Sequence, residues 1–209
     1  KAWQPTITGP NEPERLDGQR VSAAYFRTLG VAPTIGRDFQ ASDDRLNGPN
    51  VVILSDALWH RRFGADRSVV GRTVTLDGDS YLVIGVMPPS FENVLAPEAA
   101  LWAPLQYDMS QGRAWGHHLR TIGRLTPSAT IESATREINA IGRTMIAEQR
   151  PETYDPATRF DATSLRDDLT RGVRSALLAI LAAVSLVLVI ASVNVTNLLL
   201  ARGVERRSE

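Results

Sequence analysis

The sequence predicts an α+β domain followed by one transmembrane helix, and three observations support this fold class. The stretch Ser175–Ala201 contains no Asp, Glu, Lys, Arg or His. As a helix it would be roughly 40 Å long, more than the roughly 30 Å hydrocarbon core of a bilayer. The alternative, a buried central helix of a soluble protein, rarely runs this far without a charge, so we favour a membrane span. Before it, short apolar runs alternate with capped helices, over about 170 residues that can bury a substantial core.

Composition excludes several classes of protein and site. The 23 basic and 23 acidic residues balance, so no overall positive charge favours nucleic acid. The absence of cysteine excludes disulfides, thiolate metal sites and a cysteine nucleophile. Lys1 is the only lysine, and a P-loop needs a lysine within its glycine-rich motif. Any ATPase that works with this chain therefore lies outside it.

The first fifty residues predict little regular structure. Residues 1–20 are rich in Pro and Gly, and we expect a short extended piece there at most. Lys1 follows neither an initiator Met nor a signal-like segment, so we interpret it as a cut end. A short helix is predicted next, with Ser22 as N-cap and Gly30 in the left-handed position after its C-terminus. Residues 31–39 continue as a turn, and a polar loop follows.

The middle of the chain predicts a strand, a helix and a hairpin. Val51–Leu54 is a continuous apolar run, typical of a strand buried on both faces. The next helix begins at the N-cap Ser55 and stops at Gly64, with charges that suit its dipole. Two strands, 72–76 and 81–86, then flank the sequence Asp-Gly-Asp, where Gly78 provides the positive φ of a tight turn.

Three further elements are predicted before the membrane segment. The segments 101–105 and 119–125 are strand candidates. Residues 130–149 are predicted to form a helix, with Thr130 as N-cap and Pro151 after its end. Its apolar residues recur at a 3,4 spacing that predicts a stripe facing the core: Ile131, Ala134, Ile138, Ile141 and Met145. A last extended piece, 159–165, leads to the membrane helix.

No constellation of residues predicts catalysis or metal binding, and we expect no cofactor. Adjacent histidines, such as His117 and His118, point to opposite faces of a strand, and neither these nor His60 belongs to a metal-binding motif. The acidic pairs 43–44 and 167–168 are explained as solvated faces or caps. Trp102 is expected in the core, whereas Trp115 fits a core or an exposed position. The G-x-S-x-G and G-x-G-x-x-G motifs are absent.

Three stretches together carry a resemblance to a known family. They are VSAAYFRTLGVAPTIGRDF from Val21, the segment from Val51 to Pro88 that includes VVILSDALWHRRFG and VVGRTVTLDGDSYLVIGVMP, and IASVNVTNLLLARGVERRSE at the end. Their order and spacing resemble the periplasmic core domain of MacB-like ABC transporter permeases with the following helix of the FtsX-like permease unit. The chain is most similar to the large permeases with duplicated permease units that are common in soil bacteria.

The resemblance implies an architecture and a location. Residues 1–170 would be a two-lobed extracytoplasmic domain, in which a mainly β lobe, about residues 50–105, is inserted into a βαβ-like lobe. Residues 171–201 would be the second transmembrane helix of the permease, and residues 202–209 would begin its cytoplasmic segment. The location would be the inner membrane of a bacterium, with residues 1–170 in the periplasm.

The resemblance also implies a function and partners. The chain would belong to a permease subunit, not an enzyme, that couples cytoplasmic ATP hydrolysis to export or to mechanical work outside the cytoplasm. Its partners would be a separate ABC ATPase, a second permease unit and the membrane, without nucleic acid. The junction 166–174 would be a stalk that transmits movement, and Arg202, Arg206 and Arg207 would begin the segment that docks onto the ATPase. The alternative is a membrane-tethered sensor, scaffold or enzyme domain.

The membrane segment carries polar side chains that indicate contacts with other helices. At 100° per residue, one stripe holds Ser185, Ser192 and Thr196, and another face holds Asn194 and Asn197. Serine and threonine can bond back to their own helix, but buried amides prefer protein partners to lipid. We therefore expect packing into a permease dimer or pseudo-dimer. Three arginines flank each end of the span, so the positive-inside count gives no orientation.

Overall fold

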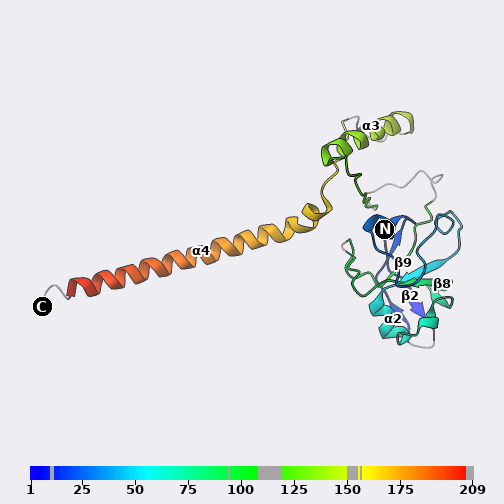
Figure 1. The fold of residues 1–209 in the computed structure, drawn as a ribbon, viewed down its shortest axis with the longest axis horizontal. Helices are drawn as coiled ribbons and strands as arrows, with labels where there is room; N and C mark the ends of the chain where they lie inside the picture. The colour runs from blue at the N-terminus through cyan, green and yellow to red at the C-terminus, as the bar shows by residue number, and fades with distance from the viewer. Residues whose placement is uncertain (10–11, 94, 108–118, 150–154, 156, 206–209) are drawn as a thin grey trace. The chain divides into compact units, whose positions relative to one another are not determined.

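The computed structural model describes residues 1–9, 12–93, 95–107, 119–149, 155 and 157–205. The chain divides into two compact units, Lys1–Arg124 and Leu125–Glu209, each of which is considered by itself. The first unit is built on a curled mixed sheet, and the second consists of two helices and a connecting segment (Figure 1). The fold is therefore of the mixed α and β kind that the sequence predicts.

Among the described residues of the first unit, nine strands form the sheet. Their bounds are β1 Ala2–Trp3, β2 Thr6–Thr8, β3 Glu14–Arg15, β4 Gly18–Val21, β5 Ile35–Gly36, β6 Val51–Leu54, β7 Thr73–Leu76, β8 Asp79–Val86 and β9 Leu101–Pro104. Their order is β1-β4-β9-β6-β8-β7-β2-β3, and β5 pairs with β8 beside this path. The strands between residues 50 and 105 thus lie in one sheet with those of the first twenty residues.

The sheet curls until its two edges meet in one N-terminal hairpin. β1 and β2 are consecutive pieces of one arm, and β3 and β4 are consecutive pieces of the other; β1 pairs with β4 and β2 with β3. In the β1–β4 half of this hairpin, β4 also pairs with β9. In the β2–β3 half, β2 also pairs with β7. The prediction of a short extended piece at most in residues 1–20 is therefore wrong. Prolines and glycines are frequent in this segment, yet strands of two to four residues form between them, and Gly18 is itself the first residue of β4.

The central strand β6 separates two hydrophobic clusters. Val52 and Leu54 belong to the cluster enclosed by the curled sheet, whereas Val51 and Ile53 belong to a cluster that includes Phe26 of the helix α1 (Tyr25–Leu29). All four residues are buried, as the continuous apolar run predicts. Trp102 of β9 is 1% exposed in the second cluster, which confirms its expected place in the core. Successive side chains of a strand alternate between faces, so one strand contributes to both clusters.

Two helices and a 3-10 turn accompany the sheet: α1 Tyr25–Leu29, α2 Asp56–Phe63 and η1 Arg67–Val69. The predicted caps of α2 are confirmed, because the Ser55 side chain accepts a hydrogen bond from the Leu58 amide and Gly64 is left-handed with φ 60°. For α1, Gly30 is left-handed with φ 78° as predicted, but Ser22 is not the N-cap. Ala24 occupies that position without a side-chain hydrogen bond, because α1 begins three residues after Ser22.

The hairpin of β7 and β8 forms as its turn sequence predicts. Asp77 and Gly78 both have positive φ, 54° and 92°, which is the backbone of a two-residue turn that matches strand twist. The Asp77 carboxylate also accepts a hydrogen bond from the Thr6 amide of β2, at 2.8 Å. This turn therefore connects β7 and β8 and contacts the N-terminal hairpin.

The second unit contains α3 Ile131–Gln149 and α4 Leu165–Glu205. The Thr130 side chain accepts a hydrogen bond from the Ser133 amide, so the predicted N-cap of α3 is confirmed. Within the described part of the second unit the predicted stripe is not buried, because Ile138 and Ile141 are 41% and 53% exposed. The contacts of α3 instead lie on a neighbouring face, where Asn139 bonds to the backbone of Phe160. The predicted strand 119–125 is also wrong: the segment has no regular secondary structure.

Candidate functional site

The described residues contain no arrangement typical of a catalytic or metal centre. His60 lies on α2, where its Nδ1 atom is 3.0 Å from the Asp56 carbonyl and 3.3 Å from the Asp56 carboxylate. No group of three or more metal-binding side chains is found in the part of the chain that the structure describes. Asp167 and Asp168 are exposed in the first turn of α4, as the explanation of solvated faces or caps predicts. His117, His118 and Trp115 lie outside the described residues.

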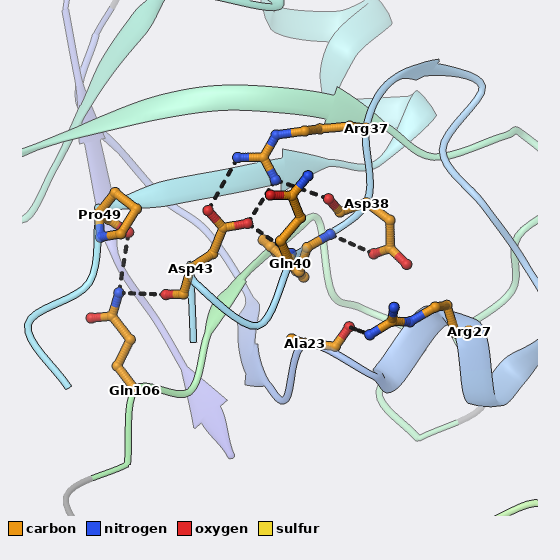
Figure 2. A network of polar contacts seen from close by, with 9 residues as sticks. Ala23, Arg27, Arg37, Asp38, Gln40, Asp43, Pro49 and Gln106 are labelled. Carbon is orange, nitrogen blue, oxygen red and sulfur yellow. Dashed lines mark hydrogen bonds and ion pairs between the residues drawn. The ribbon is translucent and has the colours of Figure 1, made fainter. Parts of the chain in front are cut away.

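The first acidic pair, Asp43 and Asp44, is instead built into a polar network, and Figure 2 shows its part around Asp43. The Asp43 side chain is only 4% exposed, and its carboxylate accepts hydrogen bonds from the Arg37 guanidinium at 2.6 and 3.1 Å and from the Gln40 amide at 2.8 Å. The expectation of a solvated face is wrong for Asp43. Its contact with Gln40 is a turn cap, which is the other role that the sequence allowed.

Electrostatics keeps the Asp43 carboxylate ionised. Burial raises the pKa of Asp43, but the hydrogen bonds from Arg37 and Gln40 and the Arg37 charge outweigh it, so the pKa lies below its ordinary value. The hydrogen bond to Asp43 in turn raises the pKa of Arg37. Asp38 differs, because burial raises its pKa despite the neighbouring arginines. The Arg37–Asp43 pair is thus a fixed ion pair with a structural role.

Asp44 and Gln106 extend this network to the end of the sheet. The Asp44 carboxylate accepts hydrogen bonds from the Ala23 and Gln106 amides, at 2.9 and 2.8 Å. The Gln106 side chain donates to the carbonyls of Asp43 and Pro49, at 3.0 and 3.1 Å (Figure 2). Gln106 has a positive φ of 46°, and it directly follows Leu105 after β9. The loop thereby fixes the start of α1 and the point where the chain leaves the sheet.

A second polar network lies beside an open pocket in the same unit. Gln19 of β4 accepts hydrogen bonds from Asn93 and from the Trp102 indole, at 2.7 and 3.3 Å. Asn93 accepts one from the Tyr25 hydroxyl at 2.8 Å, and burial raises the pKa of Tyr25 to about 12. The pocket has a volume of about 530 Å³ and is bordered by Gln19 and Tyr25. Sequence reasoning missed this network, because its members are far apart in the chain and form no motif.

The apolar segment forms the greater part of one long helix. α4 is 41 residues long and runs without a break from Leu165 to Glu205, as Figure 1 shows. Within it, Ala176–Val195 is long and apolar enough to cross a membrane. The helix begins before residue 171, so the junction 166–174 belongs to the same helix as the apolar segment.

The predicted packing residues are distributed along this helix. Ser185, Ser192 and Asn194 are exposed, and the Ser192 hydroxyl donates to the Leu188 carbonyl at 2.8 Å. Ser192 therefore bonds back to its own helix, the alternative that the sequence left open for hydroxyl side chains. The backbones of Thr196, Asn197 and Arg202 are helical, whereas Arg206 and Arg207 lie outside the described residues. Seven residues separate Ser185 from Ser192, so they share a face, and Asn194 lies on another.

Comparison with solved structures shows a related fold. The periplasmic region of MacB from Actinobacillus actinomycetemcomitans has a TM-score of 0.50 and 17% identity, over 71% of this chain and 65% of that one. A domain of a permease protein from Porphyromonas gingivalis has a TM-score of 0.48 and 20% identity, over 78% of this chain and 79% of that one. The extracellular domain of the noncanonic ABC-type transporter YknZ from Gram-positive bacteria has a TM-score of 0.41 and 21% identity, over 50% of this chain and 51% of that one. The chain thus spans about half to two thirds of the length of two of these structures.

Comparison by sequence gives the family. No curated protein matches this chain. Residues 2–141 match the family described as the MacB-like periplasmic core domain, a range that includes the whole curled sheet and the first half of α3. Because the match covers more than half of the chain, the protein belongs to the MacB-like periplasmic core domain family.

Proposed function

We propose that this chain is the extracytoplasmic domain and second transmembrane helix of an ABC transporter permease, which couples cytoplasmic ATP hydrolysis to export or to mechanical work outside the cytoplasm. The observation that carries the proposal is the unbroken helix α4 in a chain of this family. One helix that is exposed at Arg166, Asp167 and Asp168 and apolar from Ala176 to Val195 can transmit a tilt or rotation as a rigid body.

The proposed stalk is the part of α4 before the apolar segment. This stalk, residues 166–174, extends roughly 14 Å at 1.5 Å per residue. Gly172 lies within this part, yet the helix continues through it. The exposed Asp167 and Asp168 lie in the first turn, where acidic side chains favour the positive end of the helix dipole. These features support a helix that keeps its shape outside the bilayer.

The proposal includes the domain organisation that the sequence suggested. Residues 1–170 form two extracytoplasmic lobes, with the mainly β lobe at about 50–105; residues 171–201 span the inner membrane, and residues 202–209 begin the cytoplasmic segment. Arg202, Arg206 and Arg207 begin the surface that docks onto a separate ABC ATPase. Inside the membrane, Ser185, Ser192, Asn194, Thr196 and Asn197 pack against a second permease unit.

Inserting a flexible Gly-Ser linker between Thr170 and Arg171 tests the stalk. In liposomes that contain the permease and its ATPase, we expect ATP hydrolysis to continue while export, or the coupled movement of the domain, is lost. The matched control places the same linker after Ser90, an exposed residue outside regular secondary structure. Unchanged coupling with the linker at Thr170 would refute the proposed stalk.

A further inference from the structure

We propose that the pocket beside Gln19 binds a small amphipathic carboxylate, a molecule with a saturated chain and one carboxylate group. The pocket lies within the first unit, between β4, α1 and the segments 95–96 and 119–122. Its volume of about 530 Å³ falls within the ordinary range of ligand pockets. This inference concerns the first unit alone and does not depend on the proposed transport function.

Gln19 offers the pocket a hydrogen-bond donor in a fixed orientation. The Trp102 indole N–H can only donate, so the Gln19 atom that it contacts at 3.3 Å is the oxygen Oε1. Asn93 is oriented in the same way, because the Leu95 amide donates to its Oδ1 and leaves its Nδ2 to donate to Gln19. The other atom of the Gln19 side-chain amide, Nε2, therefore carries two N–H donors, and no acceptor for them is found among the described residues. An oxygen of a ligand would complete its hydrogen bonds.

Apolar side chains form one wall of the pocket. Leu95, Leu105, Leu119 and Ile122 border it, and Leu119 is 41% exposed. Ile122 and Leu95 also pack against the cluster around Phe26, so this wall is anchored to the core. A chain of methylene groups that covers these side chains would remove apolar surface from water, which is favourable.

The border of the pocket carries positive charge. Among the described residues that border it, Lys1, Arg20 and Arg120 are basic and none is Asp or Glu. The Arg20 guanidinium itself lies on the opposite face of β4 from Gln19, where it donates to the Tyr81 hydroxyl and lies 4.7 Å from the centre of the Trp3 ring, so Lys1 and Arg120 supply the positive charge of the border. Tyr25, with a pKa of about 12, stays neutral at physiological pH. The local positive charge therefore favours an anionic group over a neutral or cationic one.

The test titrates octanoate into the 209-residue chain in lipid nanodiscs and follows two signals by NMR: the Trp102 indole N–H and the Gln19 side-chain amide. Empty nanodiscs measure partition of octanoate into lipid, and octanol and octylammonium test the need for the carboxylate. We expect saturable shifts of both signals with octanoate alone. Absence of saturable shifts, or equal shifts with octanol or octylammonium, would overturn the proposal.

The informative variant is Gln19→Glu. It keeps the oxygen that accepts from Trp102 and Asn93 but replaces the amide NH2 donor by a second oxygen. We expect octanoate binding to weaken at least about tenfold, since an ionised carboxylate would then face the ligand. The control Leu82→Gln changes an exposed residue of β8 that does not border the pocket and should leave binding unchanged. Unaltered octanoate affinity in folded Gln19→Glu would exclude Gln19 as the ligand's partner.

Discussion

Asp43 shows how one side chain can organise a long loop. Its carboxylate joins Arg37 to the Gln40 amide, while its own carbonyl accepts from Gln106. The sequence showed a polar loop with two adjacent acids, for which solvation was the simpler explanation. The burial of Asp43 could not be predicted, because it depends on a loop conformation that no periodic pattern encodes.

Replacing Asp43 by Asn should destabilise the first unit. The variant keeps an acceptor but loses the charge that attracts Arg37, and we expect the free energy of unfolding to fall by about 1–3 kcal/mol. Arg37 is 41% exposed, so water can partly solvate it afterwards. Urea unfolding in detergent, followed by tryptophan fluorescence, measures the change. Asp79→Asn, at an exposed carboxylate, is the control, and equal stability of the two variants would contradict the role of Asp43.

The Arg37–Asp43 ion pair also predicts how the stability of the first unit depends on pH. The folded-state pKa of Asp43 is lowered, so the unfolded chain takes up the proton first as the pH falls. The stabilisation is complete above the unfolded pKa of about 3.9 and is lost as the pH drops through this value toward the lower folded pKa. The stability difference between the wild-type protein and Asp43→Asn should be constant between pH 7 and 5 and shrink below pH 4. A difference that grows on acidification would have the wrong sign.

Replacing Gly36 should destabilise the first unit more than replacing Asp43, because a side chain at this position would clash with the backbone. Its φ is 80°, and an added Cβ would lie 2.1 Å from the Ile84 carbonyl oxygen. Gly36→Ala should therefore prevent β5 from pairing with β8 and lower the melting temperature strongly. Gly71→Ala is the matched control, because φ is 92° there but nothing lies within 4 Å of an added Cβ. The control should cost only the backbone strain, about 1–2 kcal/mol, and equal losses in both variants would contradict the steric explanation.

At the scale of elements, local signals predicted structure well where they were complete. Ser55 and Gly64 delimit α2, and Asp77 and Gly78 form the turn between β7 and β8, because each acts on backbone groups only a few residues away. The stripe of α3 is a different case: its 3,4 spacing correctly predicted a helix but not what covers the stripe. Periodicity describes one helix, whereas burial depends on a second surface.

The amide of Asn194 predicts how α4 packs. A side-chain amide in hydrocarbon is stabilised by a partner helix, and such interhelical hydrogen bonds contribute about 0.6 kcal/mol on average. Asn194→Leu should weaken association of this chain in liposomes by about 0.5–1.5 kcal/mol, measured by energy transfer between labelled chains. Val187→Leu, one heptad away on the same face, is the control. Undiminished association in Asn194→Leu would show that this amide does not contribute to the contact.

At the scale of the whole molecule, topology was the part that local sequence could not supply. The strands of the N-terminal hairpin are two to four residues long and lie in a segment rich in prolines and glycines, so they carry too little pattern to predict. They form because β9 and β7, eighty and more than sixty residues away, offer edges with which they pair. The pocket beside Gln19 has the same origin, since β4 meets Trp102 and Asn93 only in the folded sheet.

The central claim, that a periplasmic domain precedes a helix that crosses to the cytoplasm, is tested most directly by topology. The chain has no cysteine, so Ser90→Cys and Ser208→Cys each introduce one label site; Ser90 is exposed in the first unit. Intact cells that express the permease are treated with a membrane-impermeant maleimide. The account predicts labelling at position 90 and none at 208 until the cells are opened. Labelling at 208 and not at 90 would place the domain in the cytoplasm and contradict the proposed export function.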